Sequence, residues 1–265
     1  MPEEPHPTRM PVLFVGHGNP MNALLDNVWS RGFKALGRAL PTPRAILCIS
    51  AHWYVPGTFL TANHDPRTIH DFGGFPPELY EIEYPAPGDP GLAQRVSSML
   101  GEWGANARSD WGIDHGTWTV LRHMWPSAEV PVVQLSIDGR VPPPVHLAMG
   151  QALAPLRDDG ILVMGSGNLV HNLQSAFREM HNPHPARESW ASEFDERVTS
   201  ALEGGDSGKL VHACDDPVGH LAHPSIDHYL PVLYTTGAAG AKPEVEFPLE
   251  GFDLGSISMR AVLYH

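Results

Sequence analysis

Short runs of apolar residues alternate along the chain with segments in which apolar positions recur at helical spacing. The apolar runs predict buried strands at residues 11–15, 45–50, 130–137 and 161–164. Helical spacing is found in residues 28–40, 92–103, 116–125, 145–157 and 187–203. This alternation predicts an α/β fold in which helices flank a central, mostly parallel sheet.

The remaining segments predict loops and further strands. Residues 68–89 and 181–186 are rich in proline, glycine and aromatic residues, which indicates ordered loops over a site. The tail from residue 244 carries two more apolar runs, EVEFPL and SISMRAVLYH, which predict strands at the edge of the sheet. No internal repeat or domain boundary is visible. We therefore expect one domain over residues 1–265, in which residues 1–9 are flexible.

Composition and charge exclude several classes of protein. The chain has 265 residues, of which 42% are apolar, and this is enough to bury a core. Lys and Arg number 17 against 30 acidic residues, a net charge of −13 without a basic run, so nucleic acid is not an expected partner. The two cysteines form no CxxC pair, and no stretch approaches a membrane span. We expect a cytoplasmic protein without a membrane partner, either monomeric or a homo-oligomer.

Three of the predicted strands lead into a histidine. His17 follows the first strand, His52 the second, and His171 the turn after the strand at 161–164. In open α/β sheets, ligands bind outside the carboxyl ends of the strands. Each histidine alone is typical of local capping, but their repetition favours a shared site, and imidazole is the commonest metal-binding side chain. The sequence thus predicts a metal site at this edge of the sheet.

Further histidines are candidates in the context of such a site. His228 opens a segment that predicts an amphipathic helix, and it becomes a metal ligand candidate beside the other three. His115 lies just before a predicted helix and is a candidate acid or base that does not bind metal. His70 lies in the aromatic loop, where it either contacts substrate or has a structural role.

The other histidines carry no pattern that suggests chemistry. Those expected to be solvated are His6, His181, His184, His212, His220, His223 and His265. Those without a partner pattern are His64, His123 and His146. The motifs HExxH, GxxxxGK[ST] and GxGxxG are absent, and MGSGN fails the GxSxG pattern of serine hydrolases.

Several longer motifs together resemble a known family. They are GHGNPMN at 16–22, SAHW at 50–53, IHDFGGFPPELYEIEYPAPG at 69–88, WGIDHGTW at 111–118, VPVVQLSID at 130–138, GSGNLVHNL at 165–173 and HYLPVLY at 228–234. This combination is similar to the DOPA-type extradiol dioxygenases, class III ring-opening enzymes related to the catalytic β subunit of protocatechuate 4,5-dioxygenase. The resemblance runs from about Met10 to the C-terminus.

The resemblance implies a single catalytic domain with a non-haem metal site that opens a catechol ring beside its hydroxyls, using dioxygen, to give a semialdehyde. It implies His17, His52 and His228 as metal ligands, His171 as a further ligand or an acid/base, and His115 as a catalytic histidine. The wider superfamily often uses two histidines and one glutamate, so His228 takes the place of a carboxylate. An all-histidine set suits zinc(II) as well as the iron(II) expected for activity.

Aromatic residues supply candidate substrate contacts. Phe72, Phe75 and Tyr80 in the long loop, and Tyr229 beside His228, are expected either to wall a small aromatic diol or to pack in the core. One alternative is a zinc hydrolase in which a metal-bound water attacks an amide or ester. Another is a metal-binding module without turnover. The aromatic loop between His52 and His115 favours the catechol pocket.

Overall fold

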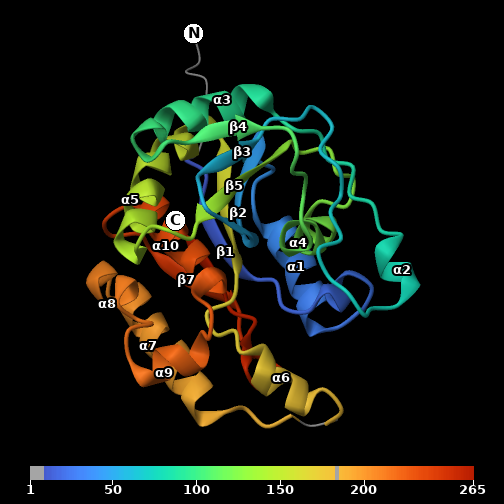
Figure 1. Ribbon diagram of the computed structural model, residues 1–265, viewed down its shortest axis with the longest axis vertical. Helices are drawn as coiled ribbons and strands as arrows, with labels where there is room; N and C mark the ends of the chain where they lie inside the picture. The colour runs from blue at the N-terminus through green and yellow to red at the C-terminus, as the bar shows by residue number, and fades with distance from the viewer. Residues whose placement is uncertain (1–8, 183–184) are drawn as a thin grey trace.

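An eight-stranded sheet forms the centre of the computed structural model, which describes residues 9–182 and 185–265 (Figure 1). In sheet order, its strands are β4 (Asn106–Arg108), β3 (Phe59–Thr61), β5 (Val132–Asp138), β2 (Ala45–Val55), β6 (Ile161–Gly167), β1 (Val12–Gly16), β10 (Ala261–Tyr264) and β7 (Val245–Leu249). Strands β5, β2, β6 and β1 run parallel, whereas β10 pairs antiparallel with β1 and with β7. The predicted α/β fold with a mostly parallel sheet is confirmed.

Helices cover both faces of this sheet. They are α1 (Val28–Ala39), α2 (Pro77–Tyr80), α3 (Pro90–Met99), α4 (His115–Met124), α5 (Pro143–Leu153), α6 (Leu173–Glu179), α7 (Ser189–Glu203), α8 (Ser207–Val211), α9 (Pro217–Ala222) and α10 (Leu230–Ala239). Because side chains alternate along a strand, Leu13 and Val15 of β1 join an apolar cluster with α1 and α4. Val12 and Phe14 join a second cluster with α5 and α10 on the other face.

Shorter elements complete the chain. The 3₁₀ turns are η1 (Pro20–Ala23), η2 (Gly101–Trp103), η3 (Ala154–Asp159) and η4 (Ile226–His228). A small antiparallel hairpin joins β8 (Phe252–Asp253) to β9 (Ile257–Ser258). Within the described residues, no helix combines the length and apolar character needed to cross a bilayer.

Two expectations for the C-terminal third are corrected. Strand β7 lies at the sheet edge as predicted, but β10 lies between β1 and β7. The helix after His228 is not amphipathic, because α10 packs between β6, β1 and α5 and nearly all of its residues are buried. His228 itself lies in η4, the turn that precedes this helix.

The parallel register aligns three strand segments at one edge of the sheet. Gly16 of β1 pairs with Gly167 of β6, and Ser50 of β2 pairs with Ser166. His17 therefore leaves the sheet directly after this row, and His52 lies two residues beyond Ser50. The carboxyl ends of parallel strands form the edge at which α/β proteins bind ligands. The register, rather than any local motif, brings these histidines together.

Candidate metal centre and substrate cavity

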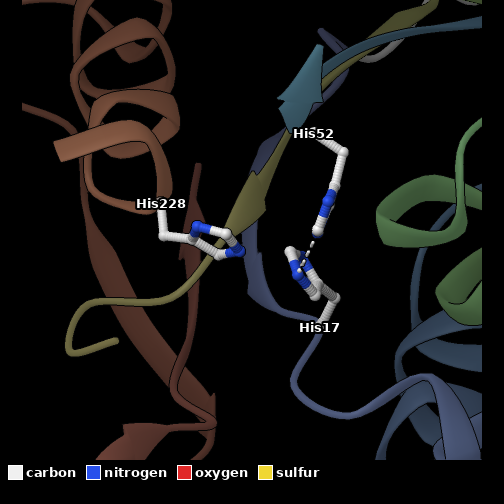
Figure 2. Close-up of side chains that lie close together, drawn as sticks. All are labelled: His17, His52 and His228. Atoms are coloured by element: carbon white, nitrogen blue, oxygen red, sulfur yellow. Dashed lines mark hydrogen bonds between the residues drawn. The ribbon is translucent and has the colours of Figure 1, made fainter. Parts of the chain in front are cut away.

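Three imidazole rings from distant parts of the chain converge at this edge (Figure 2). His17 follows β1, His52 lies in β2 and His228 lies in η4. One ring nitrogen from each falls within 4.8 Å of the other two. The Nε2 atoms of His17 and His52 are 3.1 Å apart. Three of the four predicted metal ligands therefore bring a ring nitrogen to the same place in the structure.

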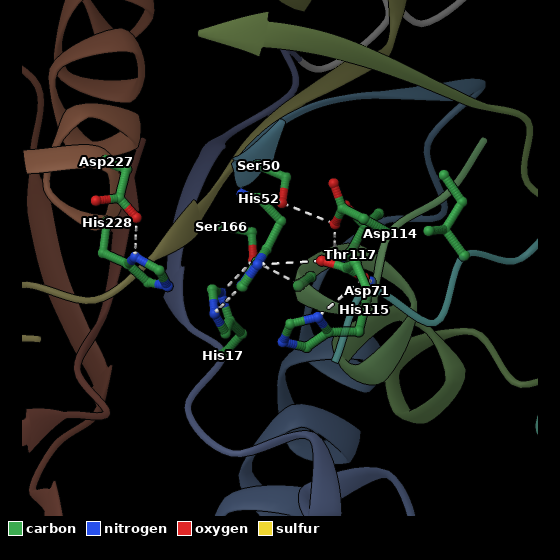
Figure 3. A network of polar contacts seen from close by, with 12 residues as sticks. His17, Ser50, His52, Asp71, Asp114, His115, Thr117, Ser166, Asp227 and His228 are labelled. Atoms are coloured by element: carbon green, nitrogen blue, oxygen red, sulfur yellow. Dashed lines mark hydrogen bonds and ion pairs between the residues drawn. The ribbon is translucent and has the colours of Figure 1, made fainter. Parts of the chain in front are cut away.

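The second nitrogen of each ring has an oxygen partner (Figure 3). The contacts are His17 Nδ1 to Ser166 Oγ at 2.9 Å, His52 Nδ1 to Asp71 Oδ2 at 3.1 Å and His228 Nδ1 to Asp227 Oδ2 at 2.6 Å. Ser166 Oγ donates its own proton to the Gly116 carbonyl at 2.5 Å, so it accepts from His17. Carboxylates accept only. All three Nδ1 atoms are therefore donors, and in the neutral rings all three Nε2 atoms carry a lone pair.

This donor set fits a divalent cation. Two Nε2 lone pairs at 3.1 Å have no proton to share, and the buried Nε2 of His228 has no hydrogen-bond partner among the described residues. A cation bound by both nitrogens at about 2.1 Å would separate them by roughly 3 Å. Metal-binding histidines commonly donate their other nitrogen to a carboxylate or similar acceptor, as these do. The residues present would thus hold a metal through three imidazoles.

Electrostatics keep two of the three rings, His17 and His228, in the neutral form that binds metal. Burial, followed by the neighbouring imidazoles, lowers the pKa of His17 well below its ordinary value. Burial also lowers the pKa of His228, and the hydrogen bond to Asp227 opposes this only in part. Burial acts the same way on His52, but the hydrogen bond to Asp71 and nearby carboxylates outweigh it and raise its pKa. A carboxylate behind the ring makes His52 the most basic donor of the three.

Asp71 connects His52, one of the three convergent histidines, to a further histidine. Its Oδ2 lies 3.1 Å from His52 Nδ1, and its Oδ1 lies 3.0 Å from His115 Nδ1. The backbone N–H of His115 also donates to Asp71 Oδ1 at 3.0 Å. Burial opposes ionisation of Asp71, but the contacts to His115 and His52 prevail and hold its pKa well below the usual range. Burial and the nearby His52 lower the pKa of His115 to about 4. His115 is therefore a neutral base beside the three ligands.

His171 occupies a different position from the other predicted ligands. Its ring stacks on His228 with centroids 3.5 Å apart and planes 4° apart. It is not among the three residues whose nitrogens converge, although it lines the same cavity. Burial, followed by His228, lowers its pKa well below the ordinary value. This placement favours a proton-handling role over ligation.

A cavity of about 280 Å³ opens beside the three rings. Phe72 and Phe75 of the long loop line it and also pack against the core. An apolar stripe on α6 and the β8–β9 hairpin form the opposite wall, with Leu173, Phe177, Met180, Leu254 and Ile257. An aromatic substrate would thus be enclosed by side chains from three separate segments.

Other predicted substrate contacts do not reach the cavity. His70 does not line it, because the ring packs against Phe72 and its Nε2 lies 2.9 Å from the Ile82 carbonyl. Tyr229 is 1% exposed and donates its hydroxyl to the Leu210 carbonyl in the core. The adjacent residue in the chain, His228, points the opposite way into the site. Tyr80 packs behind Phe72 and is also absent from the cavity wall.

The chain matches a family model described as the catalytic LigB subunit of aromatic ring-opening dioxygenase, over residues 5–259. It belongs to this family. It is 46% identical to the 4,5-DOPA dioxygenase extradiol of Escherichia coli (strain K12) over 260 residues, 96% of this chain and 94% of the relative. Identity to the 4,5-DOPA dioxygenase extradiol of Beta vulgaris is 36% over 252 residues, 92% of each chain. The predicted resemblance is confirmed.

A solved structure shares this fold. An uncharacterised protein of Escherichia coli K12 is 41% identical and aligns with a TM-score of 0.84, over 97% of this chain and 100% of that one. The chain is therefore an extradiol, ring-cleaving dioxygenase of the LigB family, a non-haem metal-dependent class. The cluster of His17, His52 and His228 is a group that could hold such a metal.

Sequence reasoning missed several residues that shape this dioxygenase site. Asp71 follows His70 in the motif HDFGG. This motif is the sequence feature that could have indicated Asp71, but the adjacent histidine was the candidate instead. Ser166 lies inside the GSGN turn, where the sequence does not indicate that the hydroxyl faces a histidine. The prediction that His223 is solvated is wrong, since it is 5% exposed and its Nε2 lies 2.8 Å from the Leu169 carbonyl. His6 and His184 lie outside the described residues.

Proposed function

We propose that His17, His52 and His228 hold iron(II) in the active enzyme and that the site opens the ring of a catechol of the DOPA type, forming a semialdehyde. The observation that carries this proposal is the convergence of three Nε2 lone pairs, each fixed by an acceptor at Nδ1. The names of the 46% and 36% identical relatives support the substrate class. We further propose that the chain forms one catalytic domain.

When bound, the metal supplies open positions for the two catechol oxygens and dioxygen, and one-electron chemistry between them. The chain's own residues then position the ring. Phe72 is in edge contact with His115, their centroids 5.4 Å apart, and with Phe75 at 5.3 Å. These rings and α6 form an apolar wall that aligns an aromatic substrate and excludes water from it.

Proton transfer falls to the two histidines that are not in the convergent set. His115 is neutral at pH 7, so it can accept a proton from a catechol hydroxyl. Asp71 faces its Nδ1 at 3.0 Å and would stabilise the imidazolium that forms. In Figure 3 the other nitrogen of His115 points away from Asp71, toward the side of His17. His171, stacked on His228, is a second neutral imidazole able to accept a proton.

The test begins with protein stripped of metal and reloaded without air, in parallel, with iron(II) or zinc(II). DOPA or 4-methylcatechol is then added, and oxygen is admitted. We expect oxygen uptake matched by a ring-opened, visibly absorbing product with iron(II) only. Hydrolysis of an amide or ester by the zinc form, with no oxygen uptake by either form across a catechol panel, would overturn the proposal.

A further inference from the structure

The charged groups around the cavity are unevenly distributed. Apart from the histidines, its ionisable lining residues within the described chain are Asp71 and Asp253. No lysine or arginine of residues 9–182 or 185–265 lines it. Asp71 is engaged by His52 and His115, whereas the role of Asp253 is not explained by the metal site.

Asp253 is a half-buried carboxylate without a cationic partner. It lies in β8, paired across the hairpin with Ile257, and it forms no ion pair with any described residue. The guanidinium of Arg187 lies 4.7 Å above the ring of the adjacent Phe252, and it makes no ion pair with Asp253. Burial raises the pKa of Asp253, as expected for a carboxylate that lacks an opposing charge.

The hairpin holds this carboxylate rigidly in the cavity wall. Leu254, which follows it, adopts φ +48°, a left-handed conformation that a leucine rarely takes and that costs about 1 kcal/mol. The next residue, Gly255, has φ +71°, and a Cβ there would lie 2.1 Å from the Ala186 carbonyl. Ser256 Oγ donates to the Asn172 carbonyl at 3.1 Å, which ties the hairpin to the start of α6. This tight turn brings both Asp253 and Leu254 to the cavity.

Asp253 accepts a hydrogen bond from the backbone N–H of Leu254 but has no cationic partner. Such a carboxylate in a wall of apolar side chains favours a cation in the cavity and disfavours an anion. The apolar wall residues Leu254, Phe177 and Met180 have no donor that could compensate an anionic group for repulsion from Asp253. A ring of Phe177 would also attract a nearby ammonium. The amino acid side chain of DOPA carries both charges, so its ammonium group could approach Asp253 while its carboxylate remains toward solvent.

We propose that Asp253 is a specificity residue that binds the ammonium group on the side chain of a catechol substrate, and that the cavity selects aminoalkyl catechols over catechols whose side chain is only anionic. This inference rests on the proposed function. It concerns the substituent remote from the reacting hydroxyls, which distinguishes it from the assignment of the metal ligands. Asp253 binds and orients; it takes no part in ring opening.

The test compares three catechols of similar size with side chains of different charge. They are 4-(2-aminoethyl)catechol, 4-ethylcatechol and 3,4-dihydroxyphenylacetate. For the iron(II)-loaded enzyme we expect kcat/KM for the amine to exceed that for the carboxylate by at least about tenfold. In Asp253→Asn this ratio should fall toward one, chiefly through the KM of the amine. The dissociation constants measured by calorimetry without oxygen should change in parallel.

The control is Asp65→Asn, which removes the same charge from an exposed residue outside the cavity wall. It should keep the wild-type ratio, because the effect is local and is not due to the net charge of −13. An equal amine to carboxylate ratio in wild type and Asp253→Asn, in both turnover and binding, would overturn the inference. If no catechol is opened, the proposed function fails, and the binding measurements still decide the role of Asp253.

Discussion

At the scale of single residues, Asp71 links two histidines to which we assign different roles. One carboxylate oxygen faces the metal ligand candidate His52 and the other faces the proposed base His115. A carboxylate bonded to the second ring nitrogen of a metal-binding histidine makes that histidine a stronger ligand. The same contact at a histidine that acts as a base stabilises the protonated ring. The two roles are separable, because His52 belongs to the set of three convergent nitrogens and His115 does not.

We expect His52→Ala to lose metal and activity together. In this variant only the imidazoles of His17 and His228 remain to bind the metal. His115→Ala should retain metal while turnover falls by a factor of about 10² to 10⁴, which is the usual contribution of a positioned acid or base. Metal content after dialysis against a chelator and the rate of oxygen uptake measure the two effects separately.

His64→Ala is the matched control, since His64 is exposed and does not line the cavity. It should keep both metal and activity. Metal loss in His115→Ala would show that His115 is a ligand and that the assigned roles are wrong. Full activity in His115→Ala would remove it from the mechanism.

Histidines could be found from the sequence because an apolar run that leads into an imidazole is a visible pattern. His17 and His52 were located in this way, and the register of β1, β6 and β2 explains why they meet. The direction in which a side chain points could not be predicted from the sequence. His70 and Asp71 are neighbours, but only the carboxylate faces the site, while the His70 ring packs near Trp118. Tyr229 likewise points into the core because His228 faces the other side of the turn.

At the scale of elements, close packing between β6 and η4 fixes the position of His228. The backbone N–H of Asn168 donates to the His228 carbonyl at 3.0 Å. A Cβ built on Gly167 would lie only 2.2 Å from this carbonyl oxygen. The strand end and the turn can therefore approach this closely only if residue 167 is glycine.

Gly167→Ala should displace η4 and with it the ring of His228. We expect a loss of about 1 to 3 kcal/mol in the free energy of unfolding, the usual cost of overpacking a core, and a weaker affinity for metal. Urea unfolding of the metal-free protein and competition with a chelator measure these effects. Gly101→Ala is the control, because a Cβ there meets nothing within 4 Å. Unchanged metal affinity in Gly167→Ala would mean that this packing does not position the ligand.

Apolar periodicity predicted the elements of the central sheet better than the cavity wall. Strands β1, β2, β5 and β6 are buried on both faces, so they appear as continuous apolar runs. The wall helix α6 is short, and its apolar residues Leu173 and Phe177 are 49% and 60% exposed. Because these exposed apolar residues do not pack in the core, their spacing along the chain does not indicate that they line the same cavity as Phe72.

At the scale of the whole molecule, histidines remote from the cavity make the fold sensitive to acid. His146 is fully buried in α5, where its Nδ1 lies 2.9 Å from the Tyr234 hydroxyl. Burial lowers its pKa to about 4. In the unfolded chain the same group titrates near pH 6.5. Between these values the unfolded state binds more protons than the folded state, so the free energy of unfolding falls as the pH falls.

From this difference we expect His146 to cost about 2 kcal/mol of stability at pH 5 relative to pH 8, with little further loss below pH 4. His146→Gln removes the titration and keeps a polar group beside Tyr234. Urea unfolding of both proteins at pH 8 and at pH 5 isolates this group, because the remaining histidines contribute equally to each. The variant should lose less stability than the wild type on acidification. Since the pKa of His146 rests on its burial, an equal loss in both proteins would show that the imidazole reaches solvent or gains a partner in the folded state.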